Sequence, residues 1–114
     1  MDHFTVSSPF VWQPAPTVVP AEQASTPALN AVNDSVNSLS GLRVAVKDLF
    51  AIEGTATTAG NPHWLATHPL AQTTASAVSK LVSAGAEVAG KTITDELAYS
   101  LNGQNIHYGT PQNP

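Results

Sequence analysis

The strongest alternation of apolar and polar residues lies over residues 42–46, and it predicts a β-strand with Lys47 at its carboxyl end. A Gly-, Thr-, Asn- and Pro-rich connection over residues 54–72 follows this strand. Apolar residues then recur at helical spacing over residues 77–82, with Thr73 or Thr74 placed to cap a helix and Gly85 placed to end it. Residues 87–89 favour β structure and are bounded by glycines, so they predict a second strand.

Strand, helix and strand in this order predict a βαβ unit, whose two strands run parallel. Parallel strands need a larger sheet with helices on both faces, and residues 41–114 supply little of either. We therefore expect an α/β fold in the form of an incomplete βαβ unit. Thr94, Asp95 and Glu96 predict a helix start, because acidic side chains are stabilised near the amino end of the helix dipole.

The first 40 residues have a different composition. They contain no Lys or Arg, and they contain Pro9, Pro14, Pro16, Pro20 and Pro27. Proline fixes φ and removes a backbone donor. Residues 1–40 are therefore predicted to form a weakly structured arm, with at most a short strand over residues 10–12 and a helical turn within 28–39. Residues 41–114 are predicted to form the domain.

Charge is scarce along the chain. Only 11% of residues are Asp, Glu, Lys or Arg, against roughly 25% in typical domains, so we expect part of this surface to be covered by other protein. A net charge of −4 argues against nucleic acid or an anionic membrane as a partner. No signal peptide or membrane span is recognisable, and the absence of cysteine fits a cytoplasmic protein.

Metal binding is not expected. His63 and His68 are flanked by Pro62 and Pro69, so they are not expected to share a helix face, and the chain offers no thiolate ligand. Neither a metal nor another cofactor is predicted.

Residues 85–92, "GAEVAGKT", match the spacing of a phosphate-binding P-loop. That loop needs a strand before its first glycine and a helix beginning at its lysine, whereas here a helix is predicted before Gly85 and a strand between the glycines. A nucleotide-binding domain is therefore kept only as a minor alternative.

Lys47 has two interpretations. It could extend to solvent or pair with Asp48, as lysines at strand ends commonly do. Alternatively it could serve as a base, because the carboxyl edge of an open α/β sheet is where ligands and catalytic groups gather. A base must be neutral, and burial disfavours the charged form of an amine.

Three blocks of the sequence resemble the amidase signature family, especially its amidase and indoleacetamide hydrolase-like branch. They are "GLRVAVKDLFAIEGTATTAGNPHW" (41–64), "AGAEVAGKTITDELAYSLNGQN" (84–105) and "HYGTPQNP" (107–114). The resemblance covers residues 39–114 and implies the N-terminal portion of a mixed-sheet α/β/α fold. It also implies a hydrolase of small carboxamides that needs no cofactor.

Within that resemblance, Lys47 matches the buried, neutral base of a Ser–cis-Ser–Lys triad. Both serines of the triad would lie beyond residue 114, so the chain is expected to be a truncated enzyme that is inactive alone. Ser100 does not match a catalytic serine. It lies in a loop that the resemblance places at the substrate pocket, made of Tyr99, Ser100, Leu101, Asn102 and Gly103. A non-catalytic remnant that needs a partner remains the alternative from another functional class.

Overall fold

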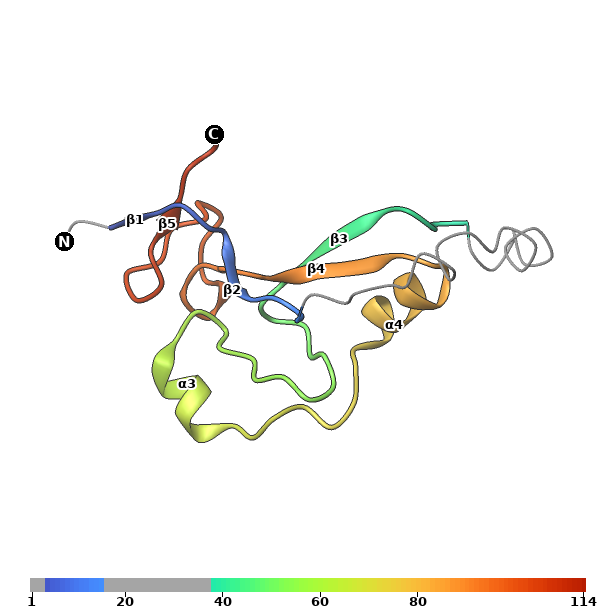
Figure 1. The fold of residues 1–114 in the computed structure, drawn as a ribbon. Coiled ribbons are helices and arrows are strands. Elements are labelled where there is room, and N and C mark those ends of the chain that lie inside the picture. Colours follow the sequence, from blue (N-terminus) through green and yellow to red (C-terminus); the bar gives the residue numbers. More distant parts are fainter. Residues whose placement is uncertain (1–3, 16–37) are drawn as a thin grey trace.

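The computed structural model describes residues 4–15 and 38–114 (Figure 1). One sheet has the strand order β2-β4-β3, and strands β1 and β5 form a second, two-stranded sheet. The strands are β1 (Thr5–Val6), β2 (Phe10–Trp12), β3 (Arg43–Lys47), β4 (Glu87–Thr92) and β5 (Thr110–Pro111). Helices α3 (Pro62–Thr67) and α4 (Ser76–Ser83) and a 3₁₀ turn, η1 (Glu96–Ala98), complete the described elements. The predicted α/β class is confirmed.

The predicted parallel strand pair is confirmed. β3 runs parallel to β4, with Lys47 opposite Thr92 at their carboxyl ends. β4 is longer than predicted because it continues through Gly90. A Cβ atom on Gly90 would lie 2.5 Å from the carbonyl oxygen of Trp12. This glycine therefore permits a close backbone approach of β2 and does not mark the end of the strand.

The amino-terminal arm contributes to both sheets. β2 pairs antiparallel with β4, so the short strand predicted over residues 10–12 is confirmed. The parallel pairing of β1 with β5, which sets Thr5 opposite Thr110, was not predicted. Strands of two residues carry no periodicity that a sequence pattern could reveal. The helical turn predicted within residues 28–39 lies almost wholly outside the described residues.

Helix α4 is confirmed, but its predicted cap is wrong. Ala75 occupies the N-cap position and provides no side-chain hydrogen bond, whereas the Thr74 hydroxyl accepts a hydrogen bond from the Glu53 N–H at 3.0 Å. The carboxyl end is as predicted. Gly85 has φ +104°, its N–H donates to the Val82 carbonyl, and the next N–H donates to the Leu81 carbonyl, which is a Schellman motif.

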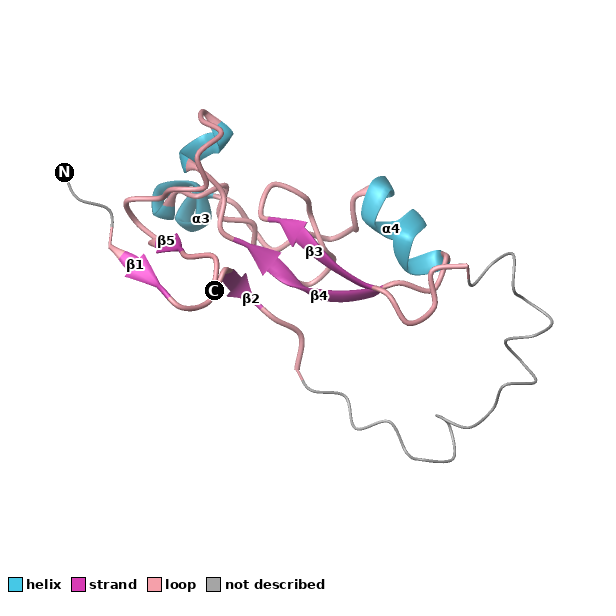
Figure 2. Ribbon diagram, turned by 90° about the horizontal axis from the view of Figure 1, so that it is seen from above, coloured by secondary structure: helices cyan, strands magenta, loops and turns pink. Residues whose placement is uncertain are grey.

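Helix α3 lies within the predicted connection and was missed. Asn61 is its N-cap and accepts a hydrogen bond from the Trp64 N–H at 2.9 Å, and Pro62 begins the helix. Asn followed by Pro is a recognisable helix start. The helix has no buried residue, so no apolar periodicity accompanied that signal. Figure 2 shows α4 beside the amino-terminal halves of β3 and β4, and α3 towards their carboxyl ends.

The helix predicted from residue 94 is limited to one turn. Leu97 and Ala98 have φ of +51° and +56°, so the backbone leaves the right-handed helical region within η1. Asp95 precedes this turn and makes no side-chain cap to it.

The apolar core of the described residues is small. Its buried apolar side chains are those of Val46, Ala59, Val78, Ala86 and Ala89. Larger apolar side chains are exposed instead, including those of Leu42, Leu70, Leu97, Tyr99 and Leu101. This distribution agrees with the expectation that further protein covers the surface.

Candidate functional site

Lys47 ends β3 at the point where the chain turns. Its carbonyl accepts hydrogen bonds from the N–H groups of Leu49 and Phe50, at 2.7 and 3.0 Å. Its side chain is exposed, and within residues 4–15 and 38–114 its ammonium has no hydrogen-bond or ion-pair partner. The resemblance implied a buried lysine, so this exposure departs from it. Within the described residues, the face of β3 that carries Arg43, Ala45 and Lys47 is exposed.

Asp48, the next residue, is fully buried, and each of its polar groups has a hydrogen-bond or ion-pair partner. Its N–H donates to the Thr92 carbonyl and its own carbonyl accepts from the Ala59 N–H, both at 3.1 Å. Carboxylate atom Oδ2 accepts from the N–H of Thr58 at 3.1 Å and from the hydroxyl of the same residue. Atom Oδ1 lies 2.9 Å from Lys91 Nζ. These contacts fix the turn that follows Lys47.

Lys91 is also fully buried, and its ammonium has three polar neighbours. Nζ donates to the Ala56 carbonyl at 3.2 Å and to the Thr57 hydroxyl at 2.8 Å, and it forms the ion pair with Asp48. The contact to Asp48 Oδ1 lacks hydrogen-bond geometry, so it is a charge pair and not a directional hydrogen bond. Because Asp48 is engaged by Lys91, the interpretation in which it pairs with Lys47 is wrong.

The P-loop interpretation is excluded by the backbone. Gly85 ends helix α4, and residues 87–92 form strand β4. A P-loop needs its amides free to bind phosphates, whereas those of β4 lie in the sheet between β2 and β3. The Lys91 ammonium is already bound by groups of the protein, namely Ala56, Thr57 and Asp48.

A surface pocket of about 360 Å³ joins Lys47 to the loop that follows η1. Three of the five predicted loop residues, Ser100, Leu101 and Gly103, line this pocket with Lys47. The other two, Tyr99 and Asn102, line a neighbouring pocket of about 390 Å³. The structure thus brings part of the predicted loop to Lys47 and places the rest beside it.

Asp95 holds the two ends of this loop together. Its buried carboxylate accepts hydrogen bonds from the N–H groups of Gly103 at 3.2 Å and Gln104 at 2.9 Å. The expectation that Asp95 stabilises a helix start is therefore wrong, because its carboxylate binds loop amides instead. The loop tip is exposed, with Tyr99 at 95% and Leu101 at 99%.

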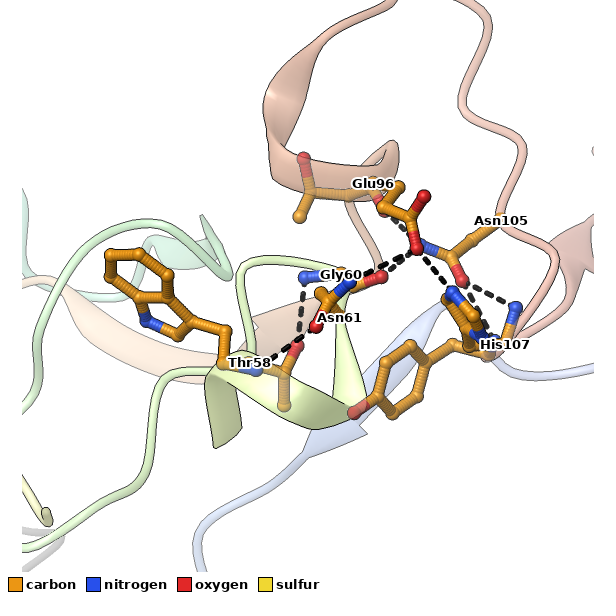
Figure 3. A network of polar contacts seen from close by, with 9 residues as sticks. Thr58, Gly60, Asn61, Glu96, Asn105 and His107 are labelled. Atoms are coloured by element: carbon orange, nitrogen blue, oxygen red, sulfur yellow. Dashed lines mark hydrogen bonds and ion pairs between the residues drawn. The ribbon is translucent and has the colours of Figure 1, made fainter. Parts of the chain in front are cut away.

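Asn105 links the loop to the rest of the fold (Figure 3). Its Nδ2 donates to the carbonyls of Gly60 at 2.9 Å and Thr94 at 2.8 Å. Its Oδ1 accepts from the N–H groups of His107 at 2.8 Å and Tyr108 at 2.9 Å. All four contacts involve backbone groups, so this buried side chain acts as a structural link.

A more exposed part of the same network lies at Glu96. Its Oε2 accepts a hydrogen bond from Asn61 Nδ2 at 3.1 Å and contacts His107 Nε2, as Figure 3 shows. These contacts connect η1 with the start of α3 and with the segment before β5. Both partners of the His107 contact are partly exposed, so it stabilises the fold only modestly.

A larger pocket, of about 710 Å³, is lined in part by β1, β2 and Tyr108 and does not include Lys47. Burial raises the pKa of the Tyr108 phenol; the side chain of Thr58 opposes this, and the charge of Asp48 adds to it. Among the described residues that line this pocket, Tyr108 is the single titratable side chain. We place the candidate site at Lys47, because its pocket is lined both by this lysine and by residues of the predicted substrate loop.

Sequence reasoning missed the buried polar residues Asp48, Lys91 and Asn105. Charged and amide side chains are mostly exposed in proteins, and no local pattern pairs positions so far apart in the chain. Within the described part of the chain, no three His, Asp or Glu side chains cluster as a metal site requires. None of the helices described is both long enough and apolar enough to cross a membrane.

Comparison with known proteins identifies relatives of this chain. Residues 15–114 match the family described as Amidase. The chain is 50% identical over 98 residues to Amidase 1 of Arabidopsis thaliana, covering 86% of this chain and 21% of that protein. It is 54% identical over 76 residues to Translocon at the outer membrane of chloroplasts 64 of Pisum sativum, covering 67% of this chain and 13% of that one.

A solved structure is also similar, from work described as "An unexpected vestigial protein complex reveals the evolutionary origins of an s-triazine catabolic enzyme". The TM-score is 0.68 at 39% identity, over 82% of this chain and 20% of that one. The chain thus spans about a fifth or less of the length of these relatives. The sequence match over residues 15–114 and the shared fold agree, and the chain belongs to the amidase family.

Proposed function

We propose that this chain contributes the general base of an amide-hydrolysing enzyme, and that Lys47 is that base. The observation that supports this proposal most directly is that the neighbouring carboxylate, Asp48, does not pair with Lys47. Asp48 is engaged by Lys91, while Lys47 lines an open pocket without a polar partner among the described residues. A lysine acts as a general base through its neutral amine, which accepts the proton.

In the proposed reaction, the Lys47 amine takes a proton from a bridging serine hydroxyl, which takes the proton of a nucleophilic serine. The serine oxygen bonds to the carbonyl carbon of a small carboxamide. The C–N bond then breaks as a proton passes to the leaving nitrogen, and ammonia or an amine departs. Water hydrolyses the acyl-enzyme and frees the serine. We assign both serines of this Ser–cis-Ser–Lys triad to protein outside these 114 residues.

The loop of residues 99–103 is proposed to line the substrate pocket. Ser100, Leu101 and Gly103 share a pocket with Lys47, which is the position that a wall of a substrate site would require. Tyr99 and Asn102 lie beside it and extend the same wall. A small amide could therefore contact the loop while its carbonyl group faces the catalytic serine.

A non-catalytic role is the second candidate. The exposed apolar side chains, together with 54% identity to a protein named as a chloroplast outer-membrane translocon, favour a segment that packs against a partner. In that case Lys47 would be an exposed lysine with no chemical task. The two candidates therefore make opposite predictions for the removal of its amine.

The test uses a chimeric amidase in which this chain replaces the matching segment of Arabidopsis thaliana Amidase 1. Release of ammonia from indole-3-acetamide and benzamide measures its activity. Lys47→Ala should lower kcat/KM by about 10² to 10⁴, the usual effect of removing a general base. Lys80→Ala is the matched control, because Lys80 is an exposed lysine on α4.

The chimeric amidase should hydrolyse at least one of the two amides. A chimera that is folded but inactive, or a Lys47→Ala variant as active as Lys80→Ala, would favour the non-catalytic role. Circular dichroism and gel filtration establish that each variant is folded before its rate is compared.

A further inference from the structure

The buried pair formed by Asp48 and Lys91 lies at the end of β3, where Asp48 directly follows Lys47. Successive side chains of a strand lie on opposite faces, and here Val46 and Asp48 are buried while Lys47, between them, is exposed. A shift of one residue in the register would bury Lys47 and expose Asp48. The ion pair to Lys91, on the neighbouring strand, therefore helps to hold β3 in the register that presents Lys47 to the pocket.

The same pair balances the charge of Asp48, the residue that follows Lys47 in the chain. Asp48 is the nearest carboxylate along the chain, and its charge is balanced by Lys91 at 2.9 Å. Asp95, which lines the same pocket as Lys47, is bonded to two loop amides. Arg43 and Glu87 lie opposite each other at the far end of β3 and β4. Helix α4 borders Lys47 with apolar side chains.

We propose that Lys91 is a positioning residue for Lys47: by pairing with Asp48, it keeps a carboxylate charge from holding the proton on the amine. This inference rests on the proposed function. Without Lys91, the negative charge of Asp48 would be unbalanced one residue from Lys47. The Lys47 amine would then keep its proton to a higher pH, and it would serve as a base only above that pH.

The pH dependence of kcat/KM in the chimeric amidase tests this proposal. Lys91→Met removes the positive charge and should move the pH of half-maximal kcat/KM upward by about one unit, the lower end of what a neighbouring opposite charge produces. Asp48→Asn leaves the ammonium of Lys91 unbalanced and should move it downward. The double variant Asp48→Asn/Lys91→Met has neither charge and should return close to the parent value.

A structural role alone would lower the rate of all three variants without moving their half-maximal pH in opposite directions. Coincident pH profiles for the folded variants would overturn the proposal. If Lys91→Met does not fold, Asp48→Asn is compared with the double variant, whose half-maximal pH should lie above that of Asp48→Asn; equal values would overturn the proposal. Failure of the proposed function is distinguishable, because it would appear as an inactive parent chimera or as an active Lys47→Ala variant.

Discussion

Lys47 and Asp48 are consecutive residues whose side chains have opposite environments: the lysine is exposed at the open end of β3, and the aspartate is fully buried against Lys91. Strand geometry accounts for the alternation. The polar groups around Asp48 account for its burial, because an unpaired carboxylate would be strongly destabilising there. A lysine that has no polar partner among the described residues is thus followed in the chain by an aspartate whose charge is balanced by Lys91.

The loop that borders this pocket should depend on Asp95. Asp95→Ala removes the acceptor for the Gly103 and Gln104 N–H groups, and leaving such donors unsatisfied costs about 1–3 kcal/mol. We expect faster hydrogen exchange over residues 96–104 of the chimeric amidase and a higher KM. Glu53→Ala is the control, because Glu53 is exposed. Equal exchange in the two variants would show that Asp95 does not hold the loop.

Gly60 and Gly54 form a matched pair for testing the packing around Asn105. Both have positive φ, but a Cβ on Gly60 would lie 2.7 Å from Asn105 Nδ2 and from the Thr94 carbonyl, whereas Gly54 has open space around it. Gly54→Ala should cost about 1–2 kcal/mol from backbone strain. Gly60→Ala should cost about 1–3 kcal/mol more from overpacking. Thermal midpoints of the two chimeric variants measure the difference, and similar midpoints would contradict the packing described.

The free energy of unfolding should fall at alkaline pH as the phenol of Tyr108 loses its proton. Its pKa is raised from the ordinary value of 10.0, so the folded state holds the phenolic proton more tightly than the unfolded state. The resulting stabilisation is fully present below pH 10.0 and is lost as the pH rises through the folded-state pKa. In Tyr108→Phe, the contribution of Tyr108 to the loss of stability at alkaline pH should be absent. Thermal midpoints between about pH 9 and pH 11 measure it, with the exposed Tyr99→Phe as a control that should follow the parent.

How far the sequence predicts this structure depends on how local each signal is. Strand β3 and the Gly85 end of α4 were predicted, because alternation and a left-handed glycine are local properties. The burial of Lys91 could not be predicted, since it depends on contacts with Asp48 and Thr57 from a distant segment. The role of Asp95 was misassigned for the same reason, because the amides that it binds belong to Gly103 and Gln104, eight and nine residues further along the chain. Lys47 was singled out by its place at a strand end and by resemblance, and its role as a base stays a prediction.

The isolated chain should be only marginally folded. Its described core contains five buried apolar residues, three of them alanines, while large apolar side chains are exposed. We expect a broad thermal transition and binding of the dye ANS, as in states with loose tertiary packing. A sharp, cooperative transition of the monomeric chain, without dye binding, would contradict this expectation.

The role of Lys47 as a base is tested most directly by the rate of amide hydrolysis by Lys47→Arg in the chimeric amidase, compared with the parent and with Lys47→Ala at equal folded fraction. A guanidinium stays protonated at any working pH, so it keeps the positive charge but cannot accept a proton. We expect Lys47→Arg to be as impaired as Lys47→Ala, by about 10² to 10⁴ in kcat/KM. Activity of Lys47→Arg close to that of the parent would contradict it, because Lys47 would then supply only a positive charge at the end of a strand.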